Sequence, residues 1–189
     1  TLLASGSCLP IRPVAALQAH LAQHPTTDFI ESVTTADVGW TIGGLNEERF
    51  TLRFPFSWKR QRRLFDGYVT LQRLLRFRRR LPQGLVPHLG SQWWCLTRPT
   101  LQAILEHPDR PTFDRYFKRV WIPDECYFQT LSRLYSSQIE SRSLTLSKFD
   151  FQGRPHLFYD DHLHLLRKDH DVSGNSVRRG KRWQSIARR

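Results

Sequence analysis

The sequence lacks methionine entirely: none occurs among its 189 residues. Since translation begins at methionine, we expect the chain to be a piece of a longer protein. Its residues also contain no signal peptide and no apolar run of about 20 residues, the length that a membrane-spanning helix needs. With 39% hydrophobic residues the chain can instead build one core, and we expect a globular domain.

Cysteine is scarce. Cys8, Cys95 and Cys126 lie far apart in the sequence, and no Cys-x-x-Cys pair occurs. An odd number of cysteines at such spacings argues against a disulfide framework and against a zinc site. We therefore expect reduced thiols, most of them buried.

Acidic residues are also few, with 17 Asp and Glu against 29 Lys and Arg and a net charge of +12. Residues 58–80 hold nine basic residues and one acid, and residues 167–189 hold eight basic residues and two acids, which leaves −2 for the remainder. Such segments indicate a solvated face or an anionic partner: nucleic acid, a membrane surface or a phosphorylated small molecule. A noncatalytic basic module that binds nucleic acid or an anionic surface is therefore one hypothesis, although no nucleic-acid motif is recognisable.

Strands and helices alternate along the sequence, which predicts an α/β protein with a sheet of mixed or parallel type. We expect strands at residues 1–7, 28–33, 93–97 and 143–149, and helices at 13–25, 64–77, from 99 onward, at 111–121, 123–134 and 160–168. Residues 169–189 have no apolar period, so we expect them to form a loose basic tail.

Three of these helices are expected to bury an apolar stripe at helical spacing. The stripes are Val14, Leu17 and Leu21; Leu64, Tyr68, Leu71 and Leu75; and Leu101, Ile104 and Leu105. The second stripe would place the first basic segment on the solvent side of a helix that is attached to the core.

Two stretches carry the candidate chemistry, "GSQWWCLTRPT" at residues 90–100 and "WIPDECYFQT" at residues 121–130. The second places Asp124 and Glu125 beside Pro123 at the start of a helix, where the macrodipole stabilises a carboxylate in any protein. Helix capping is therefore one interpretation of the two acids. The other is a catalytic base, which projects from the helix start into a dry cleft and removes a proton from an acceptor hydroxyl.

Three motifs, "SGSCLPIR" (5–12), "RRLPQGLVPHLGSQWWCLTR" (79–98) and "IPDECYFQTL" (122–131), occur together in one order and spacing. They resemble the glycosyltransferases of the core-2/I-branching and peptide O-xylosyltransferase family, over residues 3 to about 167. The resemblance implies a partial GT-A-like fold, a mixed sheet flanked by helices, with a catalytic domain at 1–168. We expect the family's first strands, which hold the nucleotide base, to be missing from this sequence. We therefore expect weak UDP binding and no measurable transfer by this chain alone, and an exposed apolar edge at residues 1–5.

The activity that the resemblance implies is the inverting transfer of xylose or N-acetylglucosamine from a UDP-sugar to a hydroxyl of a glycan or polypeptide. No metal or other cofactor is implied, and no nucleic acid is expected as a partner. Glu125 matches the family's catalytic base, and the substrate-binding positions implied are Cys8, Gly90, Ser91, Gln92, Trp93 and Asp124. Without a metal, the diphosphate of the leaving UDP needs basic side chains. The candidates are Lys148, Arg154, Arg178 and Arg179.

Three further interpretations concern individual residues. Adjacent strand residues point to opposite faces, so we expect Trp93 in the cleft, where an indole can stack on a sugar ring, and Trp94 in the core. Asp160 and Asp161 begin a predicted helix, and we interpret them as caps. The Asp-x-Asp at residues 169–171 lies in the polar tail, where a chance match is the better explanation, so we expect no metal there.

Overall fold

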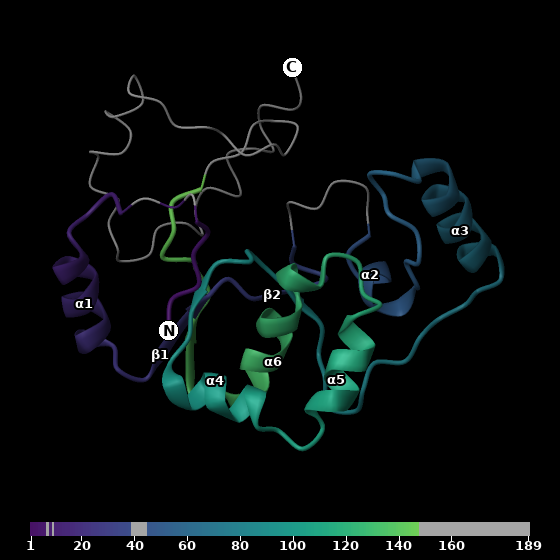
Figure 1. Ribbon diagram of the computed structural model, residues 1–189. Coiled ribbons are helices and arrows are strands. Elements are labelled where there is room, and N and C mark those ends of the chain that lie inside the picture. The colour runs from purple at the N-terminus through teal and green to yellow at the C-terminus, as the bar shows by residue number, and fades with distance from the viewer. Residues whose placement is uncertain (7, 9, 39–44, 148–189) are drawn as a thin grey trace, which may run out of the picture.

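The computed structural model describes residues 1–6, 8, 10–38 and 45–147. Helix α1 and the main sheet lie at one end of the molecule and α2 and α3 at the other, with α4, α5 and α6 between them (Figure 1). The helices are α1 (Val14–Gln23), α2 (Glu48–Thr51), α3 (Arg62–Leu74), α4 (Arg98–Leu105), α5 (Arg110–Phe117), the 3-10 helix η1 (Pro123–Glu125) and α6 (Tyr127–Tyr135). The strands are β1 (Thr27–Ile30), β2 (Val33–Thr34), β3 (His88–Leu89), β4 (Trp94–Cys95) and β5 (Gln138–Glu140).

The main sheet is small and mixed, with the strand order β4-β1-β5. Strand β1 pairs antiparallel with β4 and parallel with β5, while β2 and β3 form a separate antiparallel pair. Residues at the N-terminus extend the sheet beyond β4, because the Leu3 N–H donates to the Trp94 carbonyl (2.8 Å). A mixed sheet with helices beside it confirms the expected α/β class. Leu2 and Leu3 are each 40% exposed on this edge of the sheet, as expected.

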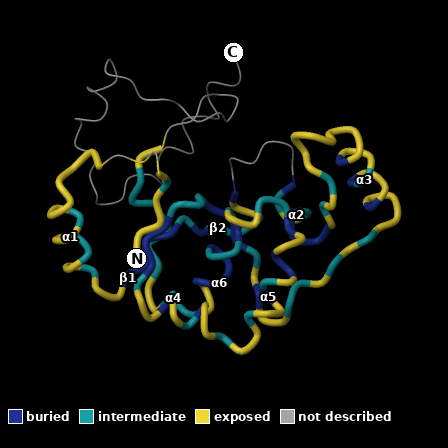
Figure 2. Tube along the Cα trace, in the orientation of Figure 1, coloured by how far each residue is buried: buried dark blue, intermediate teal, exposed yellow. Residues whose placement is uncertain are grey.

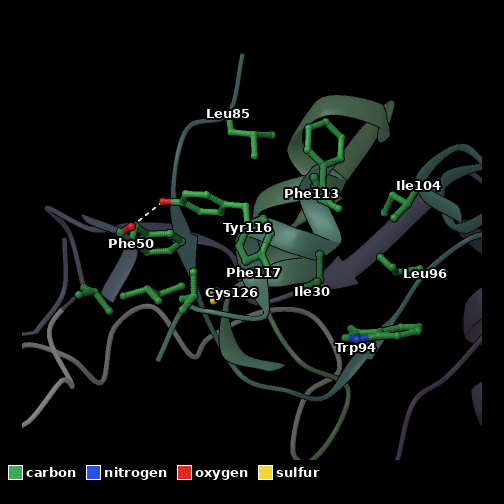
Figure 3. Packing of buried hydrophobic residues seen from close by; sticks show 14 residues of the cluster. Ile30, Phe50, Leu85, Trp94, Leu96, Ile104, Phe113, Tyr116, Phe117 and Cys126 are labelled. Carbon is green, nitrogen blue, oxygen red and sulfur yellow. Dashed lines mark hydrogen bonds between the residues drawn. The ribbon is translucent and has the colours of Figure 1, made fainter. Parts of the chain in front are cut away.

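The hydrophobic core lies between β1 and the helices α4, α5 and α6 (Figure 3). Phe29 and Ile30 of β1 are fully buried, as expected for a strand covered on both faces. Tyr116 of α5 donates its hydroxyl to the Phe50 carbonyl (2.6 Å). Burial raises the pKa of Tyr116 to about 12, so this phenol stays neutral and keeps donating.

Helix α3 forms where the sequence predicts it, but it buries a different face. Its buried side chains are Phe65, Val69 and Gln72, whereas the predicted stripe is partly or fully exposed. Tertiary contacts select the buried face of the helix. Phe65 and Val69 pack in a second hydrophobic cluster with Leu52. The Gln72 side chain donates a hydrogen bond to the Arg53 carbonyl and accepts one from the Arg53 N–H (2.9 Å each). The expected burial of Leu64, Leu71 and Leu75 is wrong.

Two other expected faces also need correction. Helix α1 has no buried residue, so the stripe that begins at Val14 is not a core face, and in α4 Ile104 is buried but Leu105 is exposed. Both helices lie at the surface: α1 contributes no residue to the core clusters, and α4 buries only Thr100 and Ile104.

The strand expected at residues 143–149 does not form over its described part, 143–147. There the Ser143 hydroxyl pairs with the Thr145 hydroxyl (2.6 Å) and accepts the Thr145 N–H (3.2 Å), a local turn that competes with a ladder. The third strand of the main sheet is β5 instead, a few residues earlier. The helix expected at 160–168, with Asp160 and Asp161, and the tail at 169–189 lie outside the described residues.

Cys95 and Cys126 are buried and Cys8 is exposed, and all three are free thiols, which confirms the expectation of reduced and mostly buried cysteines. Among the described residues, no helix combines the length and the apolar character that a membrane crossing requires.

Candidate active site

Three chain segments meet at one point: the end of β1, the loop at residues 90–93, and η1. The Gly90 N–H donates to the Glu125 carbonyl (3.0 Å), and the Ser91 N–H donates to Oε2 of Glu31 (2.9 Å). A Cβ at position 90 would lie 1.8 Å from the carbonyl oxygen of Glu31 and 2.6 Å from its carbonyl carbon. Only glycine permits this approach of two backbones, so Gly90 allows the three segments to meet.

The side chain of Gln129 in α6 connects the 90–93 loop to η1. Its side chain is fully buried, and Nε2 donates to the carbonyls of Ser91 (2.6 Å) and Asp124 (3.3 Å). Its own backbone carbonyl accepts the Ser32 hydroxyl (2.8 Å). One amide therefore fixes the loop against η1, and a buried network of this kind holds a site rigid.

The backbone before η1 has an unusual conformation. Ile122 has φ 54° and ψ 70°, in the left-handed region that a β-branched residue rarely adopts. The chain then turns through η1 and breaks again at Cys126 before α6 begins, so the single helix expected at 123–134 is two helices. Such a conformation persists only where the surroundings hold it, and it aims the two acids of η1.

The capping interpretation of Asp124 is not what the structure contains. The residues at the capping positions are Ile122 for η1 and Cys126 for α6, and neither helix start receives a side-chain capping hydrogen bond. Asp124 lies inside the 3-10 turn, where its carboxylate cannot reach the free N–H groups as an N-cap does.

Glu125 forms an ion pair with Arg49 of α2. Nη1 of Arg49 lies 2.7 Å from Oε2 of Glu125, and the two side chains are 7% and 38% exposed. The guanidinium also lies over the Trp121 ring, 4.9 Å from its centroid. A charge-assisted hydrogen bond from a buried and stacked Arg gives the carboxylate one orientation, while its exposure leaves it accessible to a substrate.

Glu31 is a second carboxylate close to this pair. Burial raises its pKa above the ordinary range, the hydrogen bond from the Ser91 N–H opposes that rise, and the charge of Glu125 adds to it. Glu31 and Glu125 therefore influence each other electrostatically. Neither Glu31 nor Arg49 was predicted as a site residue: the position of Glu31 at the end of an apolar strand was an available signal, while Arg49 has no distinguishing pattern.

A hollow of about 330 Å³ lies beside η1. Its lining is mostly apolar and aromatic, and the residues are Leu3, Gln92, Trp93, Trp94, Asp114, Phe117, Lys118, Pro123, Asp124, Tyr127 and Phe128. Trp93 is half-buried there, and Trp94 is buried in the core with its ring 4.7 Å from that of Phe128, as expected. Trp94 also lines the hollow, so the two tryptophans are not separated as the strand alternation predicts. An aromatic wall with a few polar groups suits a sugar ring.

The structure thus brings Gly90, Ser91, Gln92, Trp93, Asp124 and Glu125 together around η1, but they have different neighbours. Asp124 and Gln92 line the hollow, while Glu125 lies toward Arg49. Cys8 is exposed in a turn, where its sulfur accepts the Ser5 N–H (3.4 Å), and no contact joins it to this site in the described part of the chain.

The diphosphate-binding candidates Lys148, Arg154, Arg178 and Arg179 lie outside the described residues, as does the Asp-x-Asp at 169–171. Within residues 1–6, 8, 10–38 and 45–147, no group of three His, Cys, Asp or Glu side chains is arranged to hold a metal ion.

A comparison with curated proteins found no match. A family model, described as Branch: Core-2/I-Branching enzyme, matches residues 1–170. That span contains β1, the 90–93 loop, η1 and both carboxylates of the site, and members of the family transfer sugars from a donor to an acceptor. The chain therefore belongs to the core-2/I-branching enzyme family of glycosyltransferases.

Proposed function

We propose that this domain, in the full-length protein, transfers a sugar from a UDP-sugar to an acceptor hydroxyl with inversion, and that Glu125 is the general base. The observation that carries the proposal is the ion pair of Glu125 with Arg49, 2.7 Å long, in which the Arg is buried and the carboxylate is partly exposed. A base must be fixed in orientation and still reach its substrate, and this arrangement meets both needs.

The reaction is a single displacement. The acceptor oxygen attacks the anomeric carbon as the bond from that carbon to the β-phosphate oxygen of UDP breaks, and Glu125 receives the acceptor proton. One carboxylate suffices, because inversion needs no covalent glycosyl intermediate on the protein. Arg49 acts through Glu125, since its guanidinium occupies one carboxylate oxygen and leaves the other for the proton.

Glu31 is proposed to bind the acceptor beside the base. One of its oxygens already accepts the Ser91 N–H, and the other is available to a sugar hydroxyl.

The hollow beside Asp124 is proposed to hold a sugar ring against Trp93, with Gln92 and Asp124 as hydrogen-bond partners. The sugar transferred would be xylose or N-acetylglucosamine, and the acceptor a glycan or polypeptide hydroxyl. The small mixed sheet with its flanking helices is compatible with a GT-A-like fold, which we infer from the family.

We further propose that no metal takes part. UDP leaves with additional negative charge on its diphosphate, and basic side chains can stabilise that charge in place of a cation. Lys148, Arg154, Arg178 and Arg179 are the candidates for this role.

A transfer assay with UDP-xylose and UDP-N-acetylglucosamine, offered with glycan and serine-peptide acceptors in the presence of EDTA, tests this function. We expect a product whose new linkage is β, because both donors are α, and a rate that EDTA does not change. An α-linked product would contradict inversion. Loss of activity in EDTA with recovery in manganese would contradict the metal-free leaving-group chemistry.

A further inference from the structure

Helix α3 lies at the outer end of the molecule (Figure 1) and is exposed over much of its length (Figure 2). Four leucines on and just after it form an exposed surface, called here the leucine ridge: Leu64 (54% exposed), Leu71 (48%), Leu74 (78%) and Leu75 (68%). Three of them, Leu64, Leu71 and Leu75, recur at helical spacing and share one side of the helix.

The leucine ridge is not needed to attach α3 to the rest of the fold. The helix is attached through Phe65, Val69 and Gln72, which are buried on a different face. Isolated exposed leucines are common, but a contiguous apolar surface on a soluble domain indicates an interaction site.

Basic side chains surround the leucine ridge. Arg62 pairs with Asp66 and Arg73 pairs with Glu48. The other exposed cations near the ridge have no acidic partner in the part of the chain that the structure describes, and they are Lys59, Arg60, Arg63, Arg76 and Arg80. Two residues in this segment are exceptions. The charge of Arg78 acts on Glu48 and helps to lower the pKa of that carboxyl, and Arg79 donates to the carbonyls of Leu52, Tyr116 and Arg119.

An exposed tryptophan precedes the helix. Trp58 is 42% exposed, and the Arg62 guanidinium lies 4.7 Å from its ring centroid. Indole rings favour the boundary between lipid headgroups and acyl chains, and arginines favour lipid phosphates.

We propose that residues 58–80 form a surface that binds an anionic lipid bilayer, with α3 in the plane of the interface. The leucine ridge would enter the boundary between headgroups and acyl chains, and the unpaired cations would contact lipid phosphates. Apolar burial and attraction to anionic lipid add together in such helices. Nucleic acid fits less well, because it would satisfy the cations and leave four leucines in water. This surface goes beyond the proposed transfer chemistry and does not depend on it.

Sedimentation of the full 189-residue chain with vesicles tests the proposal. The vesicles are phosphatidylcholine alone and phosphatidylcholine mixed with phosphatidylglycerol. We expect binding to the mixed vesicles that weakens with salt, and a loss of ~10-fold or more in the partition coefficient for the double variant Leu71→Gln/Leu74→Gln. The matched control is Leu105→Gln/Leu134→Gln, which changes two exposed leucines outside the ridge and should bind as the unsubstituted chain does.

A second variant tests the charges. Arg60→Gln/Arg63→Gln should also lose ~10-fold or more on mixed vesicles, whereas Arg115→Gln on α5 should not. Because all these side chains are exposed, the variants should fold, and circular dichroism would verify that they do. Transfer of Trp58 into lipid should shift its fluorescence to shorter wavelength, and Trp58→Phe should remove that shift.

Three results would overturn the proposal. One is the absence of binding to mixed vesicles. Another is binding that the leucine variant leaves unchanged while duplex DNA competes for it, which would assign the surface to nucleic acid. The third is a lipid-free dimer that the leucine variant dissociates, which would assign the leucine ridge to a second copy of the chain.

Discussion

At the scale of residues, two adjacent acids have different surroundings. Successive residues of a 3-10 turn point in different directions, so Asp124 lines the hollow and Glu125 meets Arg49. The Pro-Asp-Glu start by itself is compatible with capping and with catalysis for both acids, and only the resemblance to the family assigned the base to Glu125. What separates them is Arg49, which is distant in sequence and was not predicted.

Arg49 is expected to matter through Glu125. Arg49→Gln removes the partner that orients the carboxylate, so we expect kcat to fall ~10-fold or more with little change in the KM of the donor. Arg49→Lys keeps the positive charge but loses the planar guanidinium and its stacking on Trp121, so we expect it to recover part of kcat. Steady-state kinetics over a range of pH checks this, and an unchanged pH profile with normal kcat in Arg49→Gln would contradict the assigned role.

Glu31 should make stability depend on pH. The pKa of Glu31 is higher in the folded protein than its ordinary value of 4.5. Protonated Glu31 therefore contributes to the folding free energy below pH 4.5, and this contribution is lost as the pH rises through the pKa of the folded state. The glutamine of Glu31→Gln cannot ionise, so this variant does not lose stability as the pH rises. We therefore expect the melting temperature of Glu31→Gln, relative to the unsubstituted chain, to increase from acidic to neutral pH. A difference that stays constant with pH would show that Glu31 titrates normally.

At the scale of elements, the helices of the central part were predictable from apolar spacing and from prolines at their starts. Their alternation with strands predicted a sheet of mixed or parallel type, and the structure has a mixed one. The spacing of apolar residues could not predict which part of the fold each helix packs against. The buried face of α3 was predicted wrongly because Phe65 and Val69, not Leu64 and Leu71, meet the second cluster. The break at Cys126 was missed because the non-helical backbone of that residue (φ −146°, ψ −21°) has no sequence signal.

Gly90 and Gly67 provide a matched test of how the elements meet. Gly90→Ala would force a Cβ within 1.8 Å of the Glu31 carbonyl oxygen, so we expect a loss of about 3 kcal/mol or more in unfolding free energy, or failure to fold. Gly67→Ala lies in the interior of α3 with nothing within 4 Å, and should gain about 0.5–1 kcal/mol.

Thermal or urea unfolding of the two alanine variants measures the contrast. Equal effects at both positions would mean that β1 and the 90–93 loop do not approach as closely as the structure has them.

At the scale of the whole molecule, the two ends of the described structure carry different features. The sheet end contributes Glu31, and the other end contributes α3 and its basic surface. The hollow is lined largely by residues of α5, η1 and α6, which lie between the two ends. The two are linked, because Phe65 of α3 packs against Trp121, and Trp121 lies under the Arg49 that pairs with Glu125. In the sequence the first basic segment and the Glu125 motif are separate features. Only the folded chain shows that packed side chains connect them.

The central claim is that Glu125, and not its neighbour, is the base. The most direct measurement compares kcat of Glu125→Gln and Asp124→Asn in the full-length protein, with circular dichroism to show that both fold. We predict that Glu125→Gln loses ~10² or more in kcat, the usual size of a lost general base, while Asp124→Asn loses far less. A Glu125→Gln enzyme that keeps its rate, with Asp124→Asn inactive, would contradict the account and move the base to the side of the hollow.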